Sequence, residues 1–244
     1  MTSVQPGTAG APGAANGHIE ARVFLQPIAA PSVLGYIALS AGLIIFGTWV
    51  AGAWGKATDF KGFMEFVMLF AGVAQLAAAL WSYKARDAVG ASIHGIWGAF
   101  WLGFGILWLT ATTGALALPA RGAFFGPAGQ WFIYIAVITW TTALAALARS
   151  PLQCFTQAVL GSGAALLAFG FISGSGGWQA TGGWLLVAAA FFSWYIAASF
   201  MINGTFGHVV LPQLSWQREG NIPGGRPLKP IEFAAGEPGV KAGQ

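Results

Sequence analysis

The sequence predicts an all-α membrane protein in which six apolar helices form one compact bundle. The first observation is composition: 56% of the 244 residues are hydrophobic and only 7% are charged, whereas a soluble globular domain carries about 25% charged residues. The second is the length of the apolar stretches, since roughly 20 such residues span the hydrocarbon core of a bilayer. The third is that most connections are short, which makes successive helices antiparallel neighbours.

Six apolar stretches are long enough to cross a membrane. They cover residues 32–54, 63–83, 89–113, 130–148, 152–173 and 178–202. Each is expected to be helical, because a lone segment in lipid must satisfy its own backbone hydrogen bonds and these stretches are too long for barrel strands. We therefore predict one transmembrane domain over 25–212. Its flanks at 1–24 and 213–244 are rich in Gly and Pro and are predicted to be disordered tails.

The basic residues predict the orientation in the membrane. An even number of spans places both termini on one side, and that side carries more of the Lys and Arg residues close to span ends. Arginine and lysine near spans favour the cytoplasmic side, so we expect both termini in the cytoplasm and the protein in the plasma (inner) membrane. The basic residues are too scattered to form a nucleic-acid-binding stripe, which excludes that class of partner.

The third stretch carries a row of small residues. Ala91, Gly95, Ala99 and Gly103 recur every four residues and therefore share one helix face. Small side chains at this spacing let a second helix approach closely, and close packing is what holds helices together in lipid. We predict helix packing at Gly95, Ala99 and Gly103.

A second face of the same stretch carries aromatic rings and a histidine. Its members are His94, Trp97, Trp101, Phe104 and Trp108. In one interpretation the rings fill the core or face lipid, with His94 hydrogen-bonded near an interface, since Trp is common at both interfaces. In the other they line a pathway, since ionisable groups inside membranes usually face a cavity. Composition does not decide between the two.

Other polar residues inside the spans are few. Gln75 lies in the middle of the second stretch, where its amide either bonds a neighbouring helix or lines a wet pore. The three histidines are too far apart in the sequence to suggest a metal site. The run Gly161-Ser162-Gly163 has Leu160 before it and no nearby second histidine, so neither an enzyme nor a cofactor is predicted.

Several short blocks follow one another in a recognisable order. They are APSVLGY at 30–36 with Pro31, Leu34 and Gly35, AGVAQ ending at Gln75, SYKARDAVGASIHGIWGAFW at 82–101, then Asn203, FGH at 206–208 and LP at 211–212. In order and spacing, over residues 31–212, they resemble the acetate uptake transporters of the succinate–acetate/proton symporter type. The sequence departs from that family's pattern at Ala30, Ser82, Gly95-Ile96 and Phe200, and His94 stands where relatives are apolar.

The resemblance implies a homohexamer of six-helix protomers in the lipid bilayer, each with its own path for small monocarboxylates and protons. It also implies an apolar constriction formed by Leu39, Trp97 and Val159, with Leu160 as the alternative to Val159. The resemblance therefore favours the interpretation in which the aromatic face lines a pathway.

A carboxylate needs hydrogen-bond donors along such a path, because burying an unpaired charge is prohibitive. The expected donors are Gln75, His94 and backbone N–H groups near Pro31, Leu34 and Gly35. We expect protonation of His94 to raise anion occupancy; alternatively, the acid crosses in its neutral form. Two further alternatives stay open: a channel for a small neutral solute such as an amide or ammonia, and a membrane sensor or assembly partner that transports nothing.

Overall fold

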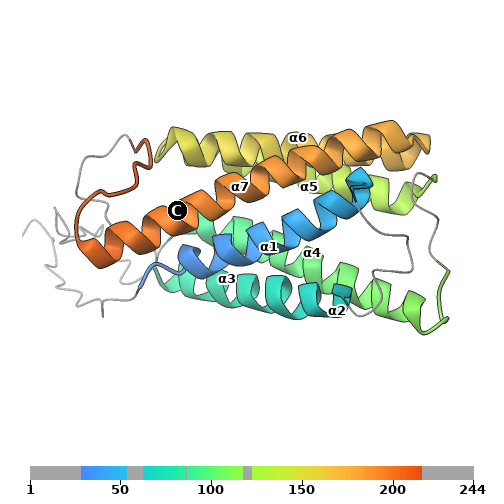
Figure 1. The fold of residues 1–244 in the computed structure, drawn as a ribbon, viewed down its shortest axis with the longest axis horizontal. Helices are drawn as coiled ribbons and strands as arrows, with labels where there is room; N and C mark the ends of the chain where they lie inside the picture. Colours follow the sequence, from blue (N-terminus) through green and yellow to red (C-terminus); the bar gives the residue numbers. More distant parts are fainter. Residues whose placement is uncertain (1–28, 54–62, 86, 118–122, 216–244) are drawn as a thin grey trace, which may run out of the picture. The chain divides into compact units, whose positions relative to one another are not determined.

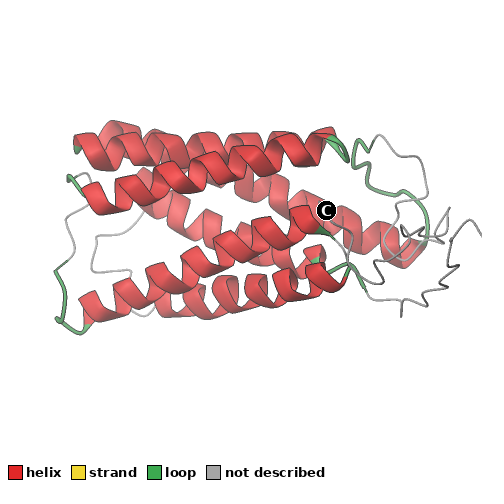
Figure 2. Cartoon of the chain, turned by 180° about the vertical axis from the view of Figure 1, so that it is seen from behind, coloured by secondary structure: helices red, strands yellow, loops and turns green. Residues whose placement is uncertain are grey.

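The structure is a computed structural model that describes residues 29–53, 63–85, 87–117 and 123–215. Within these residues all regular structure is helical (Figure 2), which confirms the all-α prediction. The helices are α1 (Ser32–Ala51), α2 (Phe63–Val67), the π-helix η2 (Met68–Val73), α3 (Ala74–Lys84), α4 (Ala88–Thr112), α5 (Gly126–Leu147), α6 (Pro151–Ser173) and α7 (Gly176–Phe206). The predicted tail 1–24 and most of 213–244 lie outside the described residues.

The predicted spans correspond to six helical segments of the bundle (Figure 1). Five of the described helices, namely α1, α4, α5, α6 and α7, are long and apolar enough to cross a membrane. The second predicted span is the continuous helical run α2–η2–α3, whose middle segment is π-helical. Helix α5 begins at Gly126, four residues before the predicted start of this span. Pro127 lies in its first turn, where the fixed φ of proline suits a helix start.

The helices pack in pairs that share long contacts. α7 lies along both α1 and α6, α5 lies along α6, and α3 lies along α4. The contact between α1 and α7 is closest at two facing glycines: a Cβ added to Gly183 would lie 2.6 Å from the carbonyl oxygen of Gly47. Such backbone-to-backbone approach needs residues without a side chain.

The predicted row of small residues on α4 is only partly a packing surface within the chain. A Cβ on Gly95 would meet Ala79 at 3.7 Å, but no described atom lies within 4 Å of a Cβ on Gly103. Ala99 and Gly103 instead line a cavity. Close packing of α4 occurs at Gly98, where a Cβ would lie 3.0 Å from Gln75. Helix packing at Ala99 and Gly103 therefore stays a prediction for a contact beyond the described chain.

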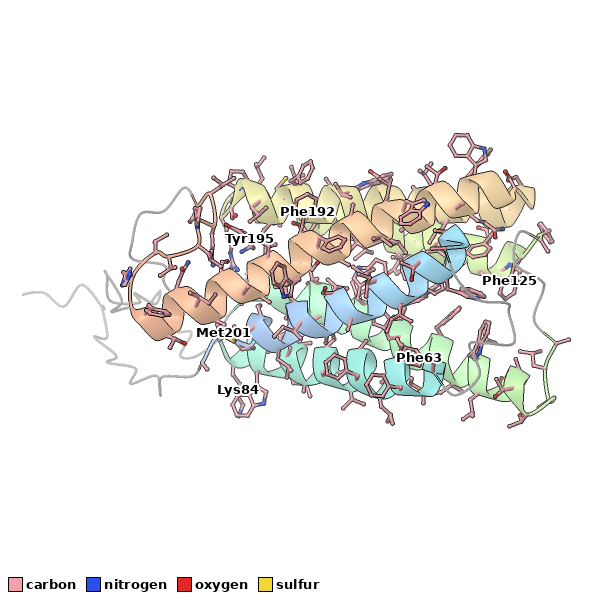
Figure 3. The ribbon with its side chains drawn as sticks, viewed as in Figure 1. Phe63, Lys84, Phe125, Phe192, Tyr195 and Met201 are labelled. Atoms are coloured by element: carbon pink, nitrogen blue, oxygen red, sulfur yellow. The ribbon has the colours of Figure 1, made fainter. Side chains whose placement is uncertain are left out.

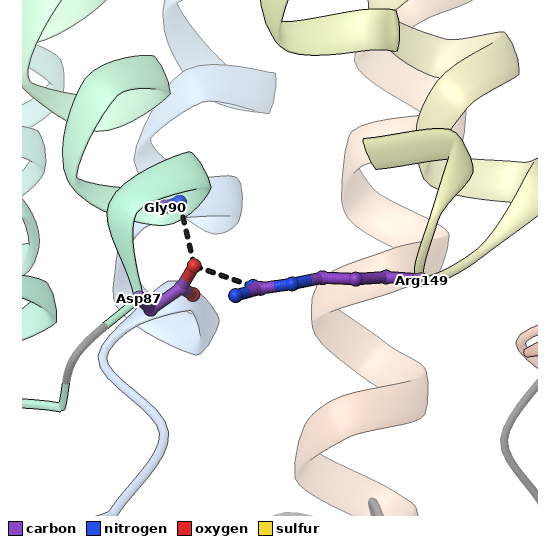
Figure 4. A network of polar contacts seen from close by, with 3 residues as sticks. All are labelled: Asp87, Gly90 and Arg149. Carbon is purple, nitrogen blue, oxygen red and sulfur yellow. Dashed lines mark hydrogen bonds and ion pairs between the residues drawn. The ribbon is translucent and has the colours of Figure 1, made fainter. Parts of the chain in front are cut away.

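One end of the bundle is held by an acidic cap. Asp87 precedes α4, and its Oδ1 accepts a hydrogen bond from the backbone N–H of Gly90 at 2.9 Å. The same oxygen accepts a hydrogen bond from Arg149, which precedes α6 (Figure 4). One carboxylate thus caps the N-terminus of α4 and ties it to the turn between α5 and α6. We call this end of the bundle the Arg149 end.

The segment after α7, residues 207–215, is attached to the same end. Asn203 Oδ1 accepts hydrogen bonds from the backbone N–H groups of Val210 and Leu211 at 2.8 and 2.9 Å. The side-chain amide of Gln213 donates to the Ser199 hydroxyl, and its backbone carbonyl accepts from the Ser150 hydroxyl. Gln213 and Ser215, which were predicted to belong to the disordered tail, are therefore bound to residues that are distant in the sequence.

The glycine contact between α1 and α7 leads to a stability prediction. Replacing Gly183 by Leu forces a side chain against the backbone of α1, and we expect a loss of about 1–3 kcal/mol or more, as in other overpacked cores. The measurement is the thermal unfolding midpoint in detergent. Gly103→Ala is the control, since its Cβ meets no described atom. A Gly183→Leu variant as stable as wild type would contradict this packing.

The Asp87 cap leads to a second prediction, which separates its two roles. Asp87→Ala removes both cap and ion pair, and loss of an N-cap costs about 0.5–2 kcal/mol. Arg149→Ala removes only a solvent-accessible ion pair, which contributes about 0–1 kcal/mol. We therefore expect Asp87→Ala to lower the unfolding midpoint more than Arg149→Ala. Asp87→Asn, which retains the cap, should resemble Arg149→Ala, and the opposite order would show that the charge pair dominates.

Candidate functional site

Three helices of the bundle start at the Arg149 end and run in the same direction. Arg149 and its partner Asp87 directly precede α6 and α4. The first residue of α1, Ser32, lies 2.9 Å from where a Cβ on Gly90 would be, close to Asp87. Residues at equal distances from the starts of α1, α4 and α6 therefore lie at similar depths in the bundle.

An apolar layer lies about two turns into these three helices. Leu39 of α1, Trp97 of α4 and Leu160 of α6 are each at most 1% exposed and belong to one hydrophobic core. The indole N–H of Trp97 donates to Thr139 of α5 at 3.2 Å. Val159 is only half-buried and packs against the outside of this core. Val159 and Leu160 were the two candidates for the α6 position in this layer, and Leu160 is the one that is fully buried.

The aromatic face of α4 points into the bundle. His94, Trp97, Trp101 and Trp108 are all buried, and Phe104 packs against them. The alternative in which these rings face lipid therefore does not hold. Phe100, one turn beyond Trp97, continues the aromatic column, with ring centroids 5.6 Å from Trp97 and 5.4 Å from Phe132 of α5.

His94 is enclosed between α4 and α1. Its side chain is fully buried, and its ring meets Tyr36 edge-on with ring centroids 5.0 Å apart. Gly35 lies against the imidazole so closely that a Cβ there would collide with it. Neither ring nitrogen has a hydrogen-bond partner among the described residues. Leaving a buried polar group unpaired costs about 1–3 kcal/mol, which water or a small polar molecule would offset.

Two buried glutamines share this property. Gln75 on α3 and Gln157 on α6 are both 0% exposed, and neither amide of these two forms a hydrogen bond within the described chain. Gln75 lies two residues after the π-helix, an element that is often found at functional sites. Because its amide bonds no described residue of another helix, the structure offers no support for Gln75 as an interhelical tie. Gln157 was not among the predicted site residues, and its burial is the signal that identifies it.

The backbone at the start of α1 was expected to offer N–H donors to a solute, and the structure shows a different arrangement. The N–H of Gly35 donates to the carbonyl oxygen of Pro31 at 3.2 Å, and that of Val33 to Ala30 at 3.2 Å. These two groups are therefore used within the helix and do not point at a ligand. Leu34 is 45% exposed and lies away from the core. Of the predicted trio Pro31, Leu34 and Gly35, only Gly35 contacts another candidate residue, His94.

A cavity of about 510 Å³ opens at the other end of the bundle. Its lining is almost entirely apolar and includes Phe100, Phe104 and Trp108 of α4 and Phe132 of α5. Phe125, which also lines it, lies far from Lys84 and Tyr195 near the Arg149 end (Figure 3). Along α4 the order is thus the Asp87 cap, His94, Trp97, Phe100 and the cavity.

Comparisons with known proteins agree with this architecture. The sequence matches the GPR1/FUN34/yaaH family over residues 13–217. Among solved structures, the fold is similar to one titled "Structure of the bacterial acetate channel SatP", with a TM-score of 0.69 and 24% sequence identity over 76% of this chain and 99% of that chain. No curated protein matches the sequence. The family match spans most of the chain and confirms the resemblance found in its motifs, so this integral membrane protein belongs to the GPR1/FUN34/yaaH family.

Proposed function

We propose that the protein is a membrane channel or transporter for small monocarboxylates such as acetate, with one route through each protomer and no catalytic role. The observation that carries the proposal is the layering along α4, in which buried polar groups without partners adjoin an apolar layer that leads to a cavity. Such side chains inside a membrane bundle are costly unless they face a path for water or solute. Likeness to a solved acetate channel supports acetate as the first solute to test.

The route narrows, in this proposal, at Leu39, Trp97 and Leu160. Apolar constrictions control passage by size and by excluding water. Val159, the other candidate for the third position, is half-buried and packs on the outside of the same core. Gln75 and His94 are proposed as hydrogen-bonding groups next to this constriction, since both have buried polar atoms without described partners.

The arrangement of the protomer in the membrane is also part of the proposal. The Arg149 end, which carries Lys84 and Arg149, is proposed to face the cytoplasm under the positive-inside rule. Protomers are proposed to assemble as a homohexamer, and transport is proposed to couple to protons. Light scattering of the purified protein checks the oligomer, and acetate accumulation with and without an imposed proton gradient checks the coupling.

A channel for a small neutral solute is the second candidate. The observation that favours it is that the described buried glutamines Gln75 and Gln157 near the constriction carry amide groups, which have no charge. An amide such as urea would match these donors and acceptors as well as an acid does.

The two candidates separate in reconstituted liposomes. We expect uptake of labelled acetate above that of empty liposomes, stronger at mildly acidic pH than at neutral pH, and no swelling response to urea. A panel of short carboxylates at both pH values then ranks the substrates. Urea-driven swelling without acetate uptake would instead establish the neutral-solute channel. No flux of either would leave the proposal without support and favour a sensor or assembly partner.

The identity of the third constriction residue leads to a prediction. Leu160→Ala shortens a side chain that points into the apolar layer, so the constriction widens. We expect the ratio of butyrate to acetate uptake to rise several-fold, because size exclusion is what the layer supplies. Val159→Ala on the neighbouring position is the matched control and should leave the ratio unchanged. A change confined to Val159→Ala would assign the constriction to Val159.

A further inference from the structure

A polar layer lies one helical turn from the apolar layer. Tyr36, His94 and Gln157 precede Leu39, Trp97 and Leu160 by three residues each on α1, α4 and α6. Residues three apart share a helix face, and three residues rise about 4.5 Å along a helix. Because all three helices run in the same direction from the Arg149 end, each polar residue is displaced toward that end. The same three helix faces therefore carry both layers.

The three polar side chains lie together and are enclosed. Tyr36 is 2% exposed, and His94 and Gln157 are 0% exposed. The Tyr36 ring meets the His94 imidazole edge-on at 5.0 Å, and the Gln157 side chain lies beside the Tyr36 phenol. Both ring nitrogens of His94 lack partners in the described chain, and the Gln157 amide contacts the Tyr36 phenol without a hydrogen bond of good geometry. Four polar atoms from two helices are thus available to one small ligand.

The donors in this layer fit a carboxyl group. Gln157 offers two N–H donors, neutral His94 one, and Tyr36 its O–H, while the amide oxygen and the second imidazole nitrogen accept. Of the described charged groups, Asp87 lies close enough to act on Tyr36 and His94, and Arg149 lies close enough to act on Tyr36. These two are paired with each other. Among the described residues, the layer therefore offers hydrogen bonds to one carboxyl group but no unpaired cation for a second.

We propose that Tyr36, His94 and Gln157 form a carboxyl-binding site on the Arg149 side of the constriction, and that Gln157 determines its preference for monocarboxylates over dicarboxylates. This rests on the proposed function, because a bound solute at the constriction presupposes a route through it. A dicarboxylate would place its second charge against buried aromatic rings or near Asp87, where no described cation is available to neutralise it.

The test compares two glutamines of α6. Full-length protein in liposomes is assayed for saturable uptake of labelled acetate, with empty liposomes subtracted. Gln157→Leu removes the amide from the site, and we expect KM for acetate to rise about tenfold, the usual effect of losing a hydrogen bond to a charged group. Gln153→Leu, one turn away and outside the site, should retain the wild-type KM. Excess succinate should compete poorly with acetate in the wild type.

Variants at His94 separate binding from packing. His94→Gln keeps a donor and an acceptor and should retain most of the acetate affinity, whereas His94→Phe keeps the ring shape and should lose it as Gln157→Leu does. If Gln157→Leu does not yield folded protein, the His94 pair decides alone. As a second readout, acetate should raise the unfolding midpoint of the wild type and of Gln153→Leu but not that of His94→Phe.

The outcomes distinguish this site from the function on which it rests. Wild-type protein that moves no acetate contradicts the proposed function. Wild-type protein that moves acetate, with KM unchanged in both Gln157→Leu and His94→Phe, overturns the site alone. Equal competition by succinate and by short monocarboxylates, or by acetamide and acetate, would overturn the assignment of the site to a single carboxyl group.

Discussion

Burial of polar side chains without partners is the constraint on which the functional argument depends. A helical bundle in lipid can satisfy its backbone internally, but the side chains of His94, Gln75 and Gln157 have no described partner and no exposure. Each such group destabilises the fold unless something small and polar occupies the space beside it. The bundle interior therefore combines a tightly packed apolar core with a few positions that are satisfied only by water or solute.

The common direction of three helices places residues that are far apart in the sequence at the same depth in the bundle. α1, α4 and α6 all start at the Arg149 end, so offsets of three residues on each helix produce parallel levels. The Asp87–Arg149 pair fixes the starts of α4 and α6 relative to each other, and Gly35 lets α1 approach the ring of His94. If one of these helices were displaced along its axis, its polar side chains would face apolar side chains of the other two. Burying polar groups against apolar ones would destabilise both layers.

Several features of the site could be predicted from the sequence, and others could not. His94 and Gln75 stand out in an apolar sequence because ionisable and amide groups are rare in membrane spans, and the family resemblance singles out Trp97. Nothing in the sequence distinguishes Gln157 from Gln153, because the two glutamines lie on the same apolar stretch, four residues apart. Only the packing of α6 shows that Gln157 is fully buried and Gln153 is not. The row of small residues was assigned correctly to one helix face, but not to a contact within the chain.

The sequence by itself determined the fold class, the approximate helix boundaries and the family, because these follow from long apolar stretches and from short motifs in a fixed order. Tertiary structure alone decided which side chains meet: Leu160 rather than Val159 in the apolar core, Tyr36 against His94, and Gln213 against Ser199. The physical reason is that these spans are hydrophobic on most faces, so their sequences do not show which face of each helix points into the bundle. Rotation of each helix is set by contacts between residues far apart in the sequence.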